Sequence, residues 1–181
     1  MADPENNPIE TSVRPAIYCI AIKFGSDKEW QFAHNQSLTN PEERESLRSA
    51  MGCSRNEILG RYIEEFTNDP SQAHTVIEDV RSKSAMGYSV AWHYVMNNFD
   101  ALNSTLGESA YNVVWTFSPW MNTDYDLQQL LGFAARYPDM PSYAAQGFYE
   151  AKLKVETNIA WMKRNRQGIT NWLNNVVINN I

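Results

Sequence analysis

Apolar residues recur every three to four positions along most of this chain, which is the spacing of amphipathic helices. No segment alternates apolar and polar residues long enough to predict a convincing strand. The pattern therefore predicts an all-α protein. The positions that define the clearest apolar faces are Ile58, Tyr62, Ile63 and Phe66; Leu127, Leu130, Leu131, Ala134 and Tyr137, before Pro138; Phe148, Ala151, Val155, Ile159 and Met162; and, in a last separate segment, Ile169, Trp172, Leu173 and Val176.

One segment has a competing interpretation. Residues 111–117 contain Val113, Val114, Trp115 and Phe117, whose side chains are common in strands. The segment stands among helical patterns, and we interpret it as a buried helix.

Four short motifs mark where helices begin. Ser26, Asn40 and Ser54 are each followed three positions later by Glu, and Thr123 is followed by Asp126. Such pairs form capping boxes, in which each side chain bonds the other residue's backbone N–H. In the second motif Pro41 takes the first helical position, which proline favours.

The first three of these caps are fourteen residues apart, which fits a helix of ten to twelve residues plus a tight turn. Consecutive helices of this length run antiparallel. We therefore predict a HEAT-like α-solenoid of short antiparallel helix pairs, although no repeat is visible residue for residue. We expect residues 1–181 to form a single domain in which residues 1–11 are an extended leader.

Composition excludes several classes of function. The formal net charge of −6 argues against nucleic-acid binding, which needs a basic surface, and against electrostatic membrane binding. The longest apolar run, residues 16–22, has seven residues and is too short to span a bilayer. The 22 aromatic side chains are enough for a sizeable core.

The sequence offers no catalytic residue, metal site or cofactor motif. The three histidines, His34, His74 and His93, share no H-E-x-x-H pattern. His74 and Glu78 are four apart, but two ligands do not make a metal site, and we interpret them as a surface pair. His93 lies between two aromatic residues and is expected to be a hydrogen-bonded core imidazole. A nucleophile elbow, a phosphate-binding glycine loop and a dinucleotide fingerprint are all lacking.

Two further features bear on the cellular compartment. Asn35 and Asn103 each begin a sequon that permits N-glycosylation if the chain is secreted. The two cysteines, Cys19 and Cys53, are too few for a disulfide-rich scaffold or a Cys-paired zinc site. These residues alone do not decide the cellular compartment.

Short sequence motifs occur in a fixed order along the chain. They are Asn7-Pro8-Ile9, Arg14-Pro15-Ala16-Ile17-Tyr18-Cys19-Ile20-Ala21-Ile22, Glu29-Trp30-Gln31-Phe32, Leu47-Arg48-Ser49-Ala50-Met51-Gly52-Cys53, Arg61-Tyr62-Ile63-Glu64, Ala91-Trp92-His93-Tyr94-Val95, Thr123-Asp124-Tyr125-Asp126-Leu127, Asn158-Ile159-Ala160-Trp161-Met162-Lys163 and Asn171-Trp172-Leu173. From about Asn6 to Leu173 the chain thus resembles one stretch of the aminopeptidase N family of zinc metallopeptidases.

The resemblance implies the second half of that family's C-terminal helical domain. In the family this domain is non-catalytic, covers the active-site chamber and in some members contacts peptide substrates. The implied partners are the catalytic domain of the same polypeptide, peptide substrates and, as in some cell-surface members, a second copy. The zinc cofactor is expected in the parent enzyme, since none of the family's catalytic motifs occurs in this sequence.

The two cysteines match the disulfide-bonded pair of extracellular family members, so the resemblance implies a Cys19–Cys53 disulfide. We expect Cys19 near the end of one helix and Cys53 at the end of the second helix after it, with Cα atoms within about 7 Å. Such a bond favours an extracellular or cell-surface location. We interpret the chain as an excised fragment whose residues 1–5 are either vector-derived or a native loop.

Two other functions remain as alternatives. In the first alternative, the domain is an extracellular docking surface for a toxin or viral ligand. In the second, it is a stand-alone helical-repeat scaffold. The coding sequence upstream of residue 1 distinguishes the scaffold from the enzyme domain, because only the enzyme carries H-E-x-x-H there.

Overall fold

The computed structural model describes residues 7–55 and 58–178, and all regular secondary structure in these residues is helical. This confirms the all-α prediction. The elements are a 3-10 helix, η2 (Thr11–Val13), and the α-helices α1 (Arg14–Phe24), α2 (Asp27–Thr39), α3 (Arg44–Met51), α4 (Ile58–Phe66), α5 (Pro70–Lys83), α6 (Ala85–Leu106), α7 (Ser109–Trp115), α8 (Asp124–Arg136) and α9 (Ser142–Ile178).

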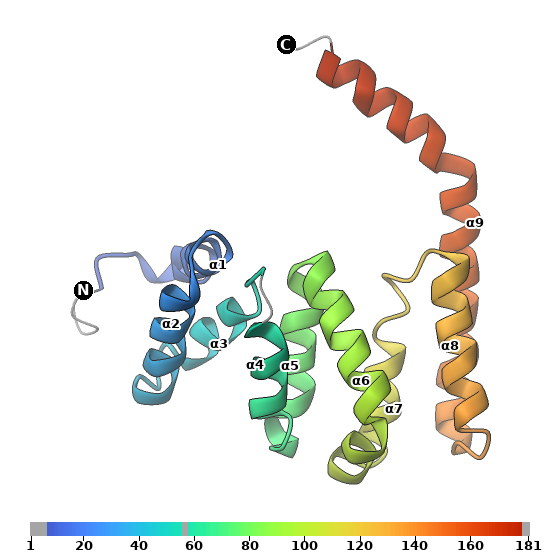
Figure 1. Ribbon diagram of the computed structural model, residues 1–181, viewed down its shortest axis with the longest axis horizontal. Helices are drawn as coiled ribbons and strands as arrows, with labels where there is room; N and C mark the ends of the chain where they lie inside the picture. The colour runs from blue at the N-terminus through green and yellow to red at the C-terminus, as the bar shows by residue number, and fades with distance from the viewer. Residues whose placement is uncertain (1–6, 56–57, 179–181) are drawn as a thin grey trace. The chain divides into compact units, whose positions relative to one another are not determined.

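The chain divides into two compact units, and the division falls after Ala110, inside α7. In the first unit each helix packs against its neighbour in sequence and against the next helix but one. The pairs α1–α3, α3–α5 and α4–α6 show the second kind of contact. This is the packing of stacked helical hairpins, as Figure 1 shows for the blue-to-green part of the chain.

Helix α4 contributes buried side chains to the core of the first unit. The four apolar positions predicted for that helix are all buried: Ile58, Tyr62, Ile63 and Phe66. Burial also raises the pKa of the Tyr62 hydroxyl. That hydroxyl donates to the Arg48 carbonyl at 2.9 Å and so ties α4 to α3.

In the second unit α8 packs against the first half of α9. The segment with two interpretations is helical, since α7 covers residues 109–115 and the chain turns at 116–120. Its Val113, Val114, Trp115 and Phe117 side chains are buried. Phe133, a core residue of α8 that the apolar pattern missed, contacts the Trp115 ring edge-to-face with the ring centroids 5.6 Å apart.

Two of the predicted capping boxes are confirmed. Ser26 caps α2, and the Glu29 carboxylate accepts from the Ser26 backbone N–H at 2.6 Å. Thr123 caps α8 in the same way with Asp126. The capping prediction at Ser54 depends on residues 56 and 57, which lie outside the described residues.

The prediction that a helix begins at Asn40 is wrong. The Asn40 N–H donates to the Gln36 carbonyl at 2.8 Å, so Asn40 ends α2. Residues 41–43 form a turn, and α3 begins at Arg44. The expected box does not form because the Asn40 N–H that it requires already bonds Gln36, and the Glu43 carboxylate is paired with Arg14.

The prediction of two separate helices after Phe148 is also wrong. Residues 142–178 form the single helix α9, with no break between Met162 and Ile169. No proline interrupts this stretch, and Gly168 weakens a helix by only about 1 kcal/mol without ending it. Ala151, Val155 and Ile159 are buried as expected, whereas Ile169, Trp172 and Leu173 are exposed. No helix in the described part of the chain is both long and apolar enough to cross a bilayer.

Asn158 holds the turn that joins α7 to α8. Its side-chain amide donates to the carbonyls of Ser118, Pro119 and Met121 at 3.2, 3.2 and 2.9 Å. We expect Asn158→Ala to lower the free energy of unfolding by about 1–3 kcal/mol, because these carbonyls lose their donor. Urea denaturation followed by circular dichroism measures the change.

Asn171→Ala is the matched control. Asn171 lies on the same helix but is exposed, and its side-chain oxygen accepts from Gln167 one turn away. Its substitution should change stability by less than about 0.5 kcal/mol. Equal effects of the two substitutions would contradict the assigned role of Asn158.

Candidate functional site

A disulfide joins α1 to the end of α3. Cys19 and Cys53 are bonded, with their Cα atoms 5.4 Å apart. Cys53 lies two residues beyond the end of α3, as expected. Cys19 lies in the middle of α1 and not near its end, because α1 continues to Phe24. The middle of α1 therefore meets the end of α3.

A second link fixes the segment before α1. The Arg14 guanidinium pairs with Glu43, and its Nε donates to the Ile9 carbonyl at 2.7 Å. The Asn7 amide donates to the Tyr18 hydroxyl at 2.7 Å. Burial and the Glu43 carboxylate raise the pKa of that hydroxyl. The link and the disulfide together clamp residues 7–24 onto α3.

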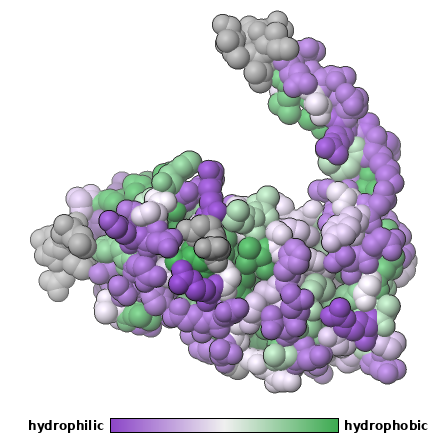
Figure 2. Space-filling view, viewed as in Figure 1, coloured by the Kyte–Doolittle hydropathy of each residue, from purple (hydrophilic) through white to green (hydrophobic). Residues whose placement is uncertain are grey.

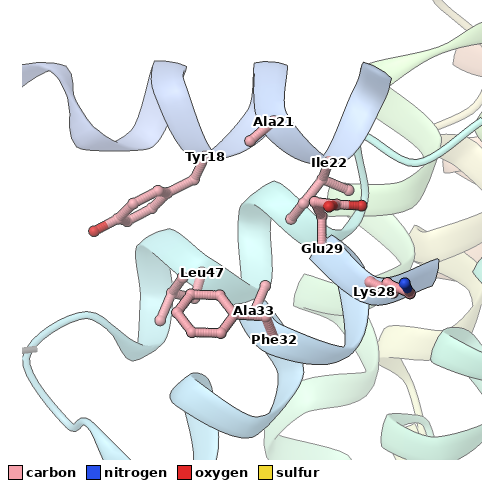
Figure 3. Close-up of a pocket in the computed structure, with 8 residues that line it drawn as sticks. All are labelled: Tyr18, Ala21, Ile22, Lys28, Glu29, Phe32, Ala33 and Leu47. Carbon is pink, nitrogen blue, oxygen red and sulfur yellow. The ribbon is translucent and has the colours of Figure 1, made fainter. Parts of the chain in front are cut away.

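An apolar cavity of about 330 Å³ lies beside this clamp (Figure 3). It is lined from α1 by Tyr18, Ala21 and Ile22, from α2 by Lys28, Glu29, Phe32 and Ala33, and from α3 by Leu47. The Glu29 carboxylate belongs to the α2 capping box, and its hydrogen bonds to Ser26 lower its pKa. Most of the wall is apolar and is therefore suited to an apolar side chain.

A larger and more polar cavity, of about 440 Å³, lies between α3, α4 and α5. Arg48 donates to Gln72, and its guanidinium carbon lies 4.9 Å from the centre of the Phe66 ring. Asp79 is hydrogen-bonded to Ser49 at the same cavity. Opposite charges thus line a partly buried space, which can hold a polar ligand.

Burial raises the pKa of Asp79, while Ser49 and Lys83 oppose the shift. The folded state therefore binds the proton of Asp79 more tightly than the unfolded state does. The stability that this carboxyl contributes is fully present below the unfolded pKa and is lost as pH rises through the folded pKa. We expect Asp79→Asn to raise the free energy of unfolding at pH 7, by less than about 1 kcal/mol. The increase in the free energy of unfolding caused by Asp79→Asn should be smaller at pH 4.

Urea denaturation at both pH values measures this difference. Asp139→Asn, in the exposed loop between α8 and α9, is the control. It should leave the free energy of unfolding unchanged at both pH values. A less stable Asp79→Asn protein at pH 7 would mean that the ionised carboxylate stabilises the fold.

The three histidines lie on different helices. The His34 Nε2–H donates to the Glu65 carboxylate at 2.8 Å, and the His34 ring stacks on Trp30. His74 is exposed, and its proposed neighbour Glu78 pairs with Arg81. His93 is hydrogen-bonded to the Ser89 carbonyl at 2.7 Å, but it is exposed, so its assignment to the core is wrong. Within residues 7–55 and 58–178, no three His, Cys, Asp or Glu side chains could hold one metal ion.

Both sequon asparagines are exposed and helical. Asn35 lies on α2 and Asn103 lies in the last turns of α6. Ser37 of the first sequon is buried and donates to the His34 carbonyl at 2.8 Å. Glycosylation of the two asparagines stays a prediction.

The sequence patterns did not predict which charged groups pair with one another at these sites. Arg14 lies on α1, Glu43 just before α3, Arg48 on α3 and Asp79 on α5, so the spacing of Arg14 from Glu43 and of Arg48 from Asp79 carries no sign of their proximity. Arg14 and Arg48 are among the residues that carry the family resemblance, and this was the available signal for them.

The fold and the clamp define a helical-hairpin stack whose first helices are locked by a disulfide. Residues 1–157 match the family model of the ERAP1-like C-terminal domain, and the chain belongs to this family.

Similar proteins agree with this assignment. The chain is 32% identical to aminopeptidase N of Canis lupus familiaris, over 94% of this chain and 18% of that protein. It is 30% identical to aminopeptidase N of Oryctolagus cuniculus and 29% identical to that of Homo sapiens, in both cases over 95% of this chain and 19% of the relative. The chain thus spans less than a fifth of the length of these relatives.

Proposed function

We propose that this chain is a non-catalytic C-terminal domain of a zinc aminopeptidase, which removes N-terminal residues from peptides. The observation that carries the proposal is the similarity to aminopeptidase N over 94–95% of the chain. In this function the domain covers the active-site chamber of its own polypeptide. Its partners are the catalytic domain and peptide substrates, and a second copy where the enzyme is dimeric.

The side chains of the first unit are compatible with such a role. A cavity with apolar walls suits the side chains of a peptide, and one with charged walls suits its polar groups. The proposal assigns the zinc ion to the parent's peptidase region, since the described part of this chain brings no three candidate ligands together.

The proposed location is extracellular or at the cell surface. The Cys19–Cys53 disulfide supports it, because disulfides persist in oxidising compartments and are rare in the cytosol. Glycans at Asn35 and Asn103 would be consistent with the same location.

The test compares the full-length parent protein with this 181-residue chain. The parent should hold one zinc ion and hydrolyse an aminoacyl anilide, and a chelator should abolish the activity. The chain alone should neither bind one equivalent of zinc nor hydrolyse the anilide. A parent without zinc-dependent aminopeptidase activity would overturn the proposal, as would a chain that is active by itself.

A further inference from the structure

The polar cavity between α3, α4 and α5 has charges of opposite sign in its wall. Its volume of about 440 Å³ is within the range of small-molecule sites. Glu45, Ser71 and Thr75 of the lining are exposed, so the cavity opens to solvent, whereas Arg48 and Asp79 are partly buried. A ligand that enters from solvent can therefore meet both of these charges.

The Arg48 guanidinium has unused hydrogen-bonding capacity. An arginine side chain carries five N–H donors, and within the described residues one of them is used, by the Gln72 side-chain oxygen. The Arg48 Nε is buried without a partner. In the same part of the chain no carboxylate is ion-paired with Arg48, and the Gln72 amide connects it to Asp69 instead, donating to that carboxylate at 2.5 Å. Because a buried donor without an acceptor costs free energy, this cation favours an anionic ligand.

Asp79 is the complementary group on the α5 side. It accepts from the Ser49 hydroxyl, while Lys83 acts on it through charge without a hydrogen bond. Burial raises the pKa of Asp79, and a cation placed beside the carboxylate would favour its ionised form. The two other charged residues of the wall are less suited to a ligand, because the Arg44 Nε donates to a carbonyl of α2 at 3.1 Å and Glu45 is exposed.

The spacing of the two charges is set by α5. The Arg48 side chain reaches that helix at Gln72, and Gln72 and Asp79 are seven residues apart on it. At 1.5 Å per residue, Asp79 lies roughly 10 Å along the helix from the residue that Arg48 contacts. Both charges also act on one group, since, besides burial, Asp79 raises the pKa of the Tyr62 hydroxyl and Arg48 lowers it.

This spacing fits a small zwitterion. The ammonium nitrogen and the carboxylate oxygens of an α-amino acid are about 3 Å apart. With a charged hydrogen bond of about 2.8 Å at each end, such a ligand spans roughly 9 Å between two protein groups. A dipeptide separates its charges by one more residue, about 3.5 Å, and is therefore less well matched.

We propose that this cavity binds a free α-amino acid as its zwitterion, with the carboxylate on Arg48 and the ammonium group on Asp79. The Ser71 and Thr75 hydroxyls, which line the same cavity, supply further polar contacts. Free amino acids are what an aminopeptidase releases, so the source of the ligand rests on the proposed function, whereas the binding itself does not.

The test is isothermal titration calorimetry of the 181-residue chain at pH 7 with L-alanine and L-leucine. Three analogues serve as comparisons. N-acetyl-L-leucine lacks the ammonium group, L-leucinamide lacks the carboxylate, and L-leucyl-L-leucine carries both charges farther apart. Because the sequence has no H-E-x-x-H motif, a zinc peptidase site does not contribute to the heat of binding.

The same titrations are made with Arg48→Gln, Asp79→Asn and the control Arg164→Gln, which changes an exposed arginine on α9. Asp79→Asn is expected to be at least as stable as the wild type at pH 7, so a loss of binding in this variant does not reflect unfolding. Circular dichroism checks that all three variants are folded.

We expect at least one of the two amino acids to bind, and L-leucine to bind at least about tenfold more tightly than each analogue. Arg48→Gln and Asp79→Asn should each weaken binding by about tenfold or more, and Arg164→Gln should leave it unchanged. No binding of either amino acid at about 10 mM would overturn the proposal, as would equal affinity for N-acetyl-L-leucine, which indicates a carboxylate site only. Unchanged binding by Asp79→Asn would overturn it too. A parent without zinc-dependent activity defeats the proposed function and leaves these results standing.

Discussion

Replacing Cys19 and Cys53 together by Ala should lower the free energy of unfolding by about 3–4 kcal/mol, as expected in the chain-entropy model for a loop of 34 residues. The bond closes a loop that contains all of α2 and α3, so its loss frees much of the first unit's N-terminal half in the unfolded state. Cys53 is buried, and the two added alanines leave a small cavity as well. Thermal and urea denaturation of the oxidised wild type and the double variant measure the difference.

The wild-type protein in reductant is the matched control, because it lacks the bond but keeps both side-chain volumes. The urea concentration at which it unfolds should be close to that of the double variant. If the oxidised wild type and the reduced wild type unfold at the same urea concentration, the bond does not constrain the unfolded chain as proposed. Mass spectrometry after alkylation without reductant should find no free thiol in secreted protein.

The sequence predicted those parts of the fold that depend on neighbouring residues. The Ser26 and Thr123 capping boxes involve side chains three positions apart, and the structure confirms both. The Asn40 prediction failed although its local pattern was equally good. There a distant partner, Arg14, takes the Glu43 carboxylate that the capping box requires.

The cavities could not be predicted for the same reason. Arg48 and Asp79 belong to α3 and α5, and only the packing of these helices brings them to one cavity. The apolar side of α9 beyond residue 160 (green in Figure 2) shows a different limit of sequence-based prediction. Its spacing is as regular as that of α4, yet α4 is buried and Trp172 is exposed. Periodicity gives the face of a helix that is apolar, but it does not give what covers that face.

Gly87→Ala should be strongly destabilising, because the backbone of α5 leaves no room for a side chain at this position of α6. A Cβ atom on Gly87 would lie 2.1 Å from the Val80 carbonyl oxygen. That oxygen belongs to the backbone of α5, so it cannot rotate away, and the helices must move apart. The Gly87 N–H also donates to the capping Ser84 hydroxyl at 2.9 Å, and this bond would be strained. We expect a loss of about 3 kcal/mol or more, at the upper end of overpacking costs.

Gly60→Ala, in the same unit, is expected to stabilise the protein, in contrast to Gly87→Ala. Gly60 lies inside α4, and a Cβ atom there meets nothing within 4 Å. Alanine favours a helix over glycine, so this substitution should stabilise the protein by about 0.5–1 kcal/mol. Urea denaturation of both variants under one condition tests the pair. Since helix propensity acts in the same direction at both positions, a difference in sign isolates the contact between Gly87 and Val80. Equal shifts would show that α5 and α6 are not packed this closely.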